Sequence, residues 1–226
     1  MADTEALFND TEDLLNICWN NVFKAVFAKD SQASRKALPR LISAVIGRDL
    51  EALGIVANEP EADVPDCDTR KQGFFPDDDF FHRFEYHDPD RKVSLGGLTL
   101  IHTLELGKLE GVSKKPVDDM SNQELWAVFF RYLNDPGMRA KINQIAKREE
   151  GIEMAGTVLL GISRNEAERA RLESEYKAEV DLQSKLGGAK REGRREGRQE
   201  RDNELLGLIA KGYTADDIRR EIEAQS

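Results

Sequence analysis

The sequence predicts an α+β protein that is predominantly helical, with a small antiparallel sheet and a long C-terminal helix. Three observations lead to this fold class. Apolar residues recur with helical spacing near the N-terminus and again over residues 121–162. Between them, over residues 80–108, apolar residues alternate with a period of two, which is typical of strands. After residue 163 the chain is highly charged and has few large apolar residues, which favours a solvated helix.

The composition limits the class of protein. At 226 residues, with 34% of them charged, the chain is long enough for one domain with a core and a solvated extension. No stretch approaches the roughly 18 consecutive apolar residues of a membrane helix, and no basic region followed by an apolar run opens the sequence. Cys18 and Cys67 lack the spacing of a disulfide framework or a zinc site. We therefore expect a cytoplasmic protein that does not associate with membranes.

The formal net charge of −10 conceals two segments of opposite sign. Residues 59–90 contain eleven acidic and three basic residues, whereas residues 185–201 contain seven basic and three acidic residues. The overall balance argues against a protein that coats nucleic acid, but the basic segment is a local candidate for such contact.

Two amphipathic helices are predicted first. Residues with a four-residue repeat form two adjacent apolar rows of the first helix: Leu14, Cys18, Val22 and Val26 beside Leu15, Trp19, Phe23 and Phe27. The second helix has its apolar face at Leu38, Leu41, Ile42, Val45 and Ile46, and Gly47 is a natural stop. Residues 53–57 then predict a short strand. Residues 58–79 predict a loop, because prolines, glycine and carboxylates interrupt any apolar pattern.

Two or three antiparallel strands follow, ending near Lys108. Phe80, Phe84 and Tyr86 alternate onto one face, and the turn residues 88–90 lead into a second run. The second run alternates apolar residues from Leu98 to Leu106.

The remainder is predicted to be helical, with well-marked starts. Ser121 and Glu124 form a capping box, with Met120 and Leu125 placed as a hydrophobic staple. Residues 135–137 break this helix, and two shorter apolar faces follow up to Ile162. Ser163 and Glu166 predict a second capping box, which opens a long helix to about Arg201. Two short helices, over residues 205–211 and 215–224, are predicted to complete the chain.

The carboxylates offer a weak candidate for metal-dependent nuclease chemistry. Such a centre needs two or three carboxylates to hold magnesium and usually a lysine near the attacking water. Asp77 followed by Asp90 and Lys92 imitates that pattern, but Asp90 and Lys92 lie in or after a turn, so we favour a structural interpretation. Glu105 and Lys108 are a second pair, which we discount because residues three apart on a strand point to opposite faces.

No metal site is expected from the histidines. His82 and His87 alternate onto opposite faces of their strand, and His102 lies within a leucine face, where a buried and hydrogen-bonded imidazole is the common outcome. The sequence contains no serine hydrolase signature, no P-loop and no GxGxxG.

A four-residue repeat over residues 191–198 places arginines at positions i and i+4, which could follow the phosphates of a nucleic acid. The candidate nucleic-acid-binding residues are Lys190, Arg191, Arg194, Arg195, Arg198 and Arg201. A solvated, salt-bridged helix is the favoured alternative, because a net charge of +4 would release only a few counterions. Each internal glycine costs roughly 1 kcal/mol of helix stability relative to alanine, so this stretch is expected to be frayed or conditional on binding.

Several stretches resemble one family. Residues 19–27 (WNNVFKAVF), 74–86 (FFPDDDFFHRFEY) and 104–109 (LELGKL) are similar to the PD-(D/E)XK nuclease family transposases, also called recombination-promoting nucleases. Further similarities occur at 126–133 (WAVFFRYL), 149–155 (EEGIEMA), 174–177 (SEYK) and the glycine-arginine tail. Together they cover nearly the whole chain in the order of the family.

The resemblance also implies an internal deletion. In proteins of this family, several elements lie between the regions similar to 58–60 and 74–76. They are a strand with an aspartate, a strand with a Glu-x-Gln-like or Glu-x-Thr-like pair, and helices with an arginine-tyrosine signature. Here only residues 64–73 stand between those regions, with 68–70 as the stub of the first strand. Asn21 stands where similar proteins tend to have aspartate. By the same comparison, residues 77–79 and 90–92 match a region outside the catalytic strands.

From this resemblance we expect residues 1–162 to form a truncated nuclease-like domain, with 58–79 as the loop at the deletion. The small sheet would then be the remnant of a restriction-endonuclease-like core, and residues 163–226 a charged long helix with a helical tail. The expected function is that of a degenerate, catalytically inactive member of this mobile-element family, whose reaction is Mg²⁺-dependent phosphodiester hydrolysis. No cofactor is expected here, since Mg²⁺ belongs to the intact family.

Two other functions stay open. The chain could be a non-enzymatic protein that binds DNA, a second copy of itself or an intact family member through its long helix and arginine-rich tail. Alternatively, residual cleavage could use carboxylates between Asp66 and Asp90.

Overall fold

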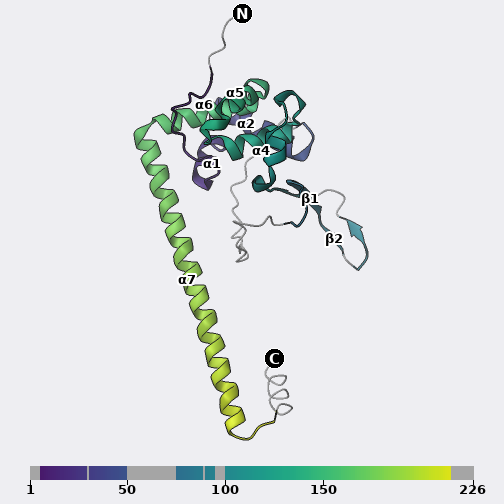
Figure 1. The fold of residues 1–226 in the computed structure, drawn as a ribbon, viewed down its shortest axis with the longest axis vertical. Helices are drawn as coiled ribbons and strands as arrows, with labels where there is room; N and C mark the ends of the chain where they lie inside the picture. The colour runs from purple at the N-terminus through teal and green to yellow at the C-terminus, as the bar shows by residue number, and fades with distance from the viewer. Residues whose placement is uncertain (1–5, 30, 50–74, 89, 95–99, 215–226) are drawn as a thin grey trace, which may run out of the picture. The chain divides into compact units, whose positions relative to one another are not determined.

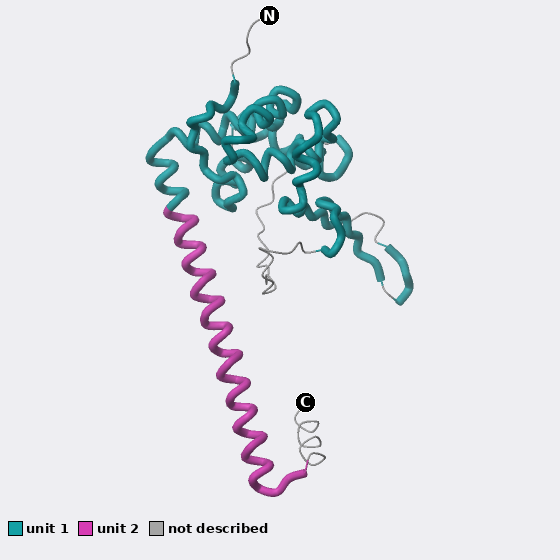
Figure 2. Tube along the Cα trace, in the orientation of Figure 1, with its two compact units in different colours: residues 1–173 teal, residues 174–226 magenta. Residues whose placement is uncertain are grey.

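The computed structural model describes residues 6–29, 31–49, 75–88, 90–94 and 100–214 (Figure 1). Most of these residues are helical, and the strands form small antiparallel sheets, which confirms the predicted mixture at this coarse level. The chain divides into two units, residues 1–173 and 174–226 (Figure 2). None of the helices in the described residues is long and apolar enough to span a membrane.

Five helices of the first unit pack around one apolar core: α1 (Asn20–Phe27), α2 (Gln32–Ile46), α4 (Asn122–Tyr132), α5 (Arg139–Arg148) and α6 (Glu150–Arg164) (Figure 1). Aromatic rings occupy the centre, where Trp126 lies 6.0 Å from both Phe27 and Phe129 between ring centroids. The capping box at Ser121 is present as predicted, with Met120 and Leu125 buried in the core beside it.

The first predicted helix is too long at its N-terminal end. Helix α1 begins at Asn20, and the preceding Leu14 and Leu15 are buried in a segment that is not helical. Side chains from distant helices bind its backbone: Leu15 N–H donates to Ser163 Oγ (3.1 Å), and Asn134 Nδ2 donates to the Leu14 carbonyl (2.6 Å). These bonds replace the helical ones, so Leu14 and Leu15 at the start of the repeat are buried without a helix, and Cys18 is exposed.

The β-region contains two antiparallel pairs within the described residues. Strand β1 (Phe81–Glu85) pairs with β4 (Leu100–Leu104), and β2 (His87–Asp88) pairs with β3 (Val93–Ser94). Strand β4 ends at Leu104, because Leu106–Lys108 form the 3-10 turn η1. The helix α3 (Glu110–Ser113) and the turns η2 (Val117–Asp119) and η3 (Pro136–Met138) complete the connections around α4. The predicted strand at 53–57 and the loop up to residue 74 lie outside the described residues.

Helix α7 (Glu166–Ala210) is 45 residues long. Asn165 starts it by accepting a hydrogen bond from Glu168 N–H (3.1 Å), so the capping role predicted for Ser163 is wrong. The predicted division into helices ending near Arg201 and starting at Leu205 is also wrong, because the helix is continuous. It ends at Ala210, and Gly212 just beyond it has a φ of 86°, which permits the closing bonds from Gly212 N–H to Ile209 O and from Tyr213 N–H to Leu208 O. The predicted helix at 215–224 lies outside the described residues.

Candidate functional site

The first candidate site is a cluster of four polar side chains at one end of the β1/β4 pair. Antiparallel pairing sets Phe81 opposite Leu104, so the start of β1 lies beside the end of β4. Asp77 precedes β1, His82 lies on β1, Glu105 follows β4 and Lys108 belongs to η1. The register therefore brings these side chains together from separate segments.

Lys108 is the centre of this cluster. Its Nζ lies 2.5 Å from Glu105 Oε2 and 3.4 Å from Asp77 Oδ1, and it donates to the carbonyl of Phe75 (2.9 Å). His82 Nε2 lies 3.0 Å from both carboxylate oxygens of Asp77. The side chains of Lys108 and Glu105 are only 14% and 11% exposed, whereas Asp77 is 50% exposed. The cluster thus has one solvent-facing carboxylate and a largely enclosed ion pair.

The pKa shifts follow from these contacts. The hydrogen bond from His82 lowers the pKa of Asp77, and the Asp79 N–H and Lys108 act in the same direction against partial desolvation. Burial disfavours the charged form of Lys108, but hydrogen bonds to Glu105 and Asp77 outweigh it and raise the pKa of Lys108. Lys108 therefore stays protonated at neutral pH and is unsuited to accept a proton.

The expectation that Glu105 and Lys108 point apart is wrong. It assumed a strand through residue 108, whereas the 3-10 turn of η1 directs the Lys108 side chain back towards Glu105. Gly107, inside the run LELGKL, is the sequence signal that could have indicated the end of the strand.

Asp90 and Lys92 do not join Asp77, as the imitated nuclease pattern would require. They lie in the tight connection between β2 and β3, where the Asp88 carboxylate accepts bonds from Asp90 N–H (2.9 Å) and Arg91 N–H (3.1 Å). Lys92 is exposed and has a φ of 53°, which fits a turn position. Of the three candidates, only Asp77 belongs to the cluster, and the lysine beside it is Lys108.

The residues of this cluster do not fit the Mg²⁺ that the family resemblance implies for intact relatives. The Lys108 ammonium already lies between the two carboxylates and compensates their charge. In the part of the chain that the structure describes, no group of three or more histidine, cysteine, aspartate or glutamate residues could hold a metal ion. The geometry fits a structural ion-pair cluster that attaches residues 75–79 to the end of the sheet.

His102 differs from its expected role in one respect. Its ring packs 5.5 Å from that of Phe81, but both ring nitrogens are buried without a hydrogen-bond partner among the described residues. Burial, helped by the nearby charge of Arg83, lowers the pKa of His102, so its neutral form is favoured.

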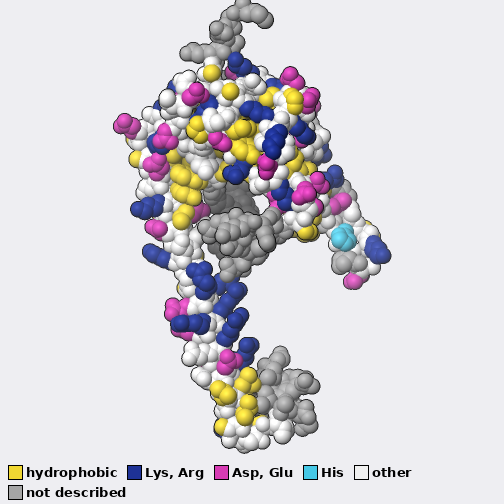
Figure 3. All heavy atoms as spheres, in the orientation of Figure 1, with side chains coloured by type: hydrophobic (Ala, Val, Ile, Leu, Met, Phe, Trp, Pro, Cys, Tyr) yellow, Lys and Arg dark blue, Asp and Glu magenta, His cyan; other side chains and the backbone are white. Residues whose placement is uncertain are grey.

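The second candidate site is the arginine face of α7, which we define as Lys190, Arg191, Arg194, Arg195, Arg198 and Arg201. At 3.6 residues per turn, these six cations fall within an arc of about 140°, and Glu192, Glu196 and Glu200 fall on the other side of the helix. In Figure 3 the basic side chains gather along this part of α7. All six are solvent-exposed.

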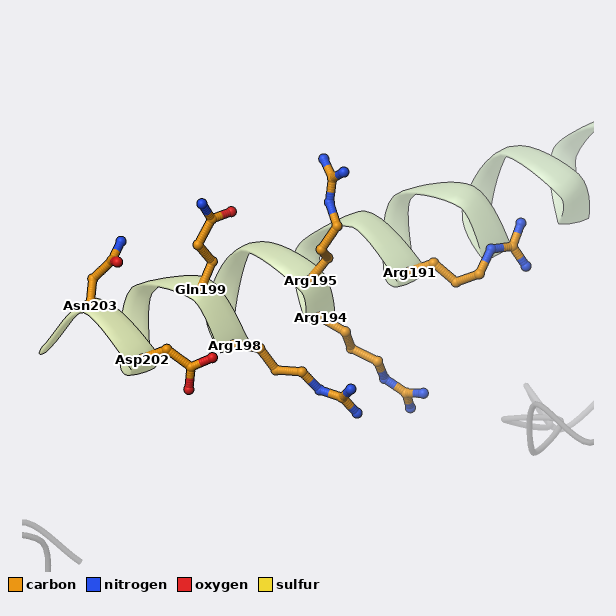
Figure 4. Close-up of a pocket in the computed structure, with 7 residues that line it drawn as sticks. All are labelled: Arg191, Arg194, Arg195, Arg198, Gln199, Asp202 and Asn203. Carbon is orange, nitrogen blue, oxygen red and sulfur yellow. The ribbon is translucent and has the colours of Figure 1, made fainter. Parts of the chain in front are cut away.

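The long side chains of this face extend from the helix and leave a hollow between them (Figure 4). The lining comes from one helix alone, so the hollow is an open surface and no enclosed pocket. Its lining residues are Arg191, Arg194, Arg195, Arg198, Gln199, Asp202 and Asn203.

Charges over residues 190–201 of α7 are segregated more than a salt-bridged helix would require. Arg191 and Arg195 are four residues apart, as are Arg194 and Arg198, and the three glutamates follow the same spacing on their own side. Over residues 185–205, all of which the structure describes, a single ion pair forms, between Arg195 and Glu192 at 3.6 Å. Intrahelical pairing therefore leaves most of the positive charge uncompensated.

Comparison with protein-family models, curated proteins and solved structures finds no match for this chain. The relationship to nuclease family transposases therefore stays a prediction from the sequence.

Proposed function

We propose that this protein binds DNA through the arginine face of α7 without cleaving it, as a degenerate relative of the PD-(D/E)XK nuclease family transposases. The observation that carries the proposal is the segregation of charge on α7. Like charges at i and i+4 destabilise a helix by a few tenths of a kcal/mol per pair, so a helix that only needed to be soluble would gain from alternating them. A polyanion laid along the arginine face removes this repulsion and releases the counterions of its phosphates.

The arginine face favours duplex backbone over single strands. Proteins that hold single strands usually stack bases on aromatic side chains. Between Tyr176 and Tyr213 the sequence contains no aromatic residue, so α7 has charge but no stacking platform there. The expected binding is therefore independent of sequence and strongly dependent on salt.

The absence of cleavage is proposed from the polar cluster at the β1/β4 end. Lys108 compensates the carboxylates of Asp77 and Glu105, and its raised pKa keeps it charged. The carboxylates that a metal would need are thus engaged in holding residues 75–79 in place.

A binding experiment with a matched control tests the first half of the proposal. Fluorescence anisotropy of a labelled duplex is measured with the full-length protein at several salt concentrations. The variant Arg191→Ala/Arg194→Ala/Arg198→Ala should bind more than about tenfold more weakly at low salt, with a salt slope shallower by about 3. The control Lys177→Ala/Lys185→Ala/Lys211→Ala removes the same charge from α7 and from the turn that follows it, outside the arginine face. An equal loss of DNA affinity in both variants would overturn the assignment of binding to the arginine face, because it would show only an effect of total charge.

A cleavage experiment tests the second half. Purified, monodisperse protein is incubated with supercoiled plasmid and Mg²⁺ or Mn²⁺, beside an EDTA control. We expect no nicking. Metal-dependent nicking that disappears in Asp77→Ala/Asp90→Ala, or in Glu105→Gln, would overturn the proposal of an inactive protein and assign a working centre to these carboxylates.

A further inference from the structure

The first turns of α7 are bound to the rest of residues 1–173 by hydrogen bonds and by one buried side chain. Leu172 is buried (1% exposed), and its carbonyl accepts a hydrogen bond from Asn21 Nδ2 (2.6 Å). Arg169 donates to both the carbonyl and the carboxylate of Asp13 at 2.8 Å and 2.7 Å. These contacts fix the helix as far as about Leu172.

Beyond residue 173 the helix has little burial to stabilise it. Leu172 is its only buried residue, and every residue from 189 to 204 is exposed, so burial contributes little to the turns of the arginine face. Most helical stability in proteins comes from packing of an apolar face, and isolated helices are marginal in water. The later turns of α7 are therefore sensitive to intrinsic propensity and to charge.

Propensity and charge are both unfavourable over residues 185–201. Gly187, Gly188, Gly193 and Gly197 interrupt this stretch, and at the last three a Cβ atom would have open space around it. No close packing at these three positions requires a residue without a side chain, and each glycine lowers the helix propensity of the segment. The repulsion within the arginine face acts in the same direction.

We propose that helix formation over residues 185–201 is coupled to nucleic-acid binding: phosphates neutralise the arginine face and complete α7. This inference rests on the proposed function and deepens it. On this proposal the continuous helix is the form that binds nucleic acid, the segment in the free protein exchanges between helical and unfolded states, and part of the binding free energy is used to order it. The glycines then weaken the affinity for nucleic acid without contacting it, because they raise the free-energy cost of forming the helix.

The glycine positions permit a direct test. Gly193 lies on the side of α7 away from most of the arginine face, and Gly197 lies just outside its edge, next to Lys190 around the helix, so a methyl group at these positions adds helix propensity and no charged or hydrogen-bonding contact to DNA. Far-ultraviolet circular dichroism of the full-length protein is recorded as a short duplex is added, and affinity is measured by anisotropy. The wild-type protein should gain helix on binding. Gly193→Ala/Gly197→Ala should be more helical when free, gain less helix with DNA, and bind about three- to tenfold more tightly.

Gly161→Ala is the matched control. Gly161 is an exposed glycine inside α6, and a Cβ there would meet no atom within 4 Å apart from the backbone of its own helix turn and its chain neighbours, so alanine adds propensity in the body of the protein alone. It should leave both DNA affinity and the DNA-induced helix gain unchanged. Heparin serves as a polyanion without base pairs and should induce the same gain at saturation, because neutralisation drives the coupling.

The outcomes separate this inference from the function on which it rests. DNA binding without a gain in helix, or without tighter binding by Gly193→Ala/Gly197→Ala, would overturn the coupling and leave the binding function standing. A helix gain with DNA but none with saturating heparin would overturn charge neutralisation as its cause. Failure of the wild-type protein to bind duplex at low salt would overturn the proposed function and the coupling together.

Discussion

Lys108 and Glu105 meet across a single 3-10 turn, with Lys108 Nζ 2.5 Å from Glu105 Oε2 in a largely enclosed position. The same ammonium donates to the Phe75 carbonyl, and Phe75 N–H donates to Glu105 (3.4 Å). One ion pair thus joins the end of β4, the turn η1 and the segment before β1.

Removing Lys108 alone should therefore harm the fold more than removing an exposed lysine. Lys108→Met leaves the Glu105 carboxylate largely buried without its cation. A buried, unpaired carboxylate destabilises the folded state unless its own negative charge is also removed. We expect a lower Tm than for Lys114→Met, whose pair with Glu110 is 72% and 85% exposed. The double variant Lys108→Met/Glu105→Gln should recover part of the loss in thermal unfolding. A catalytic role for the pair without a structural one predicts an unchanged Tm in all three variants.

The lowered pKa of Asp77 makes a contribution to stability that depends on pH. Because its folded-state pKa lies below the usual value of about 3.9, its contribution is present above that value and is lost as pH falls towards the folded pKa. Urea unfolding of the wild-type protein should therefore lose more stability between about pH 5 and pH 3 than that of Asp77→Asn. Parallel pH profiles for the two proteins would show that the contacts of Asp77 do not stabilise the fold.

Local patterns in the sequence predicted part of the fold. The capping box at Ser121 depends on residues three apart, and both of its hydrogen bonds form. The two-residue alternation on either side of the turn residues predicted antiparallel strands here, although it did not specify that β1 pairs with β4. Features that a few neighbouring residues determine are thus readable without any knowledge of distant contacts.

The features that the sequence did not predict depend on contacts between distant residues, or on the end of a strand that the apolar alternation does not mark. Leu104, Glu105 and Leu106 continue the strand alternation, so nothing before Gly107 marks the end of β4, and the Glu105–Lys108 pair was discounted. The arginine face could be identified from spacing alone, whereas its low content of ion pairs required side-chain positions.

Two glycines of α6 should respond oppositely to the same substitution. A Cβ on Gly156 would lie 2.6 Å from Phe8 Cζ and 2.9 Å from Leu7 Cδ2, and the Phe8 side chain is buried at 1% exposure. Gly156→Ala should destabilise the protein by about 1–3 kcal/mol through overpacking. Gly161→Ala has open space and should stabilise it by roughly 0.5–1 kcal/mol through helix propensity. Chemical denaturation measures both, and stabilisation by Gly156→Ala would show that the N-terminal segment does not pack on α6.

Ser163 has two possible roles, and a substitution there distinguishes them. As an N-cap of α7 it would support the start of that helix, but the structure places it inside α6 with its hydroxyl bound to Leu15 N–H, 148 residues away. Ser163→Ala should therefore leave a buried backbone N–H unsatisfied and cost about 1–3 kcal/mol. Native-state hydrogen exchange should show faster exchange at Leu15 and little change at Glu166 and Glu168. The opposite pattern, with the loss confined to the first turn of α7, would return Ser163 to a capping role. Asn165→Ala is the companion variant, since its side chain accepts from Glu168 N–H, and it should affect that first turn while leaving Leu15 protected.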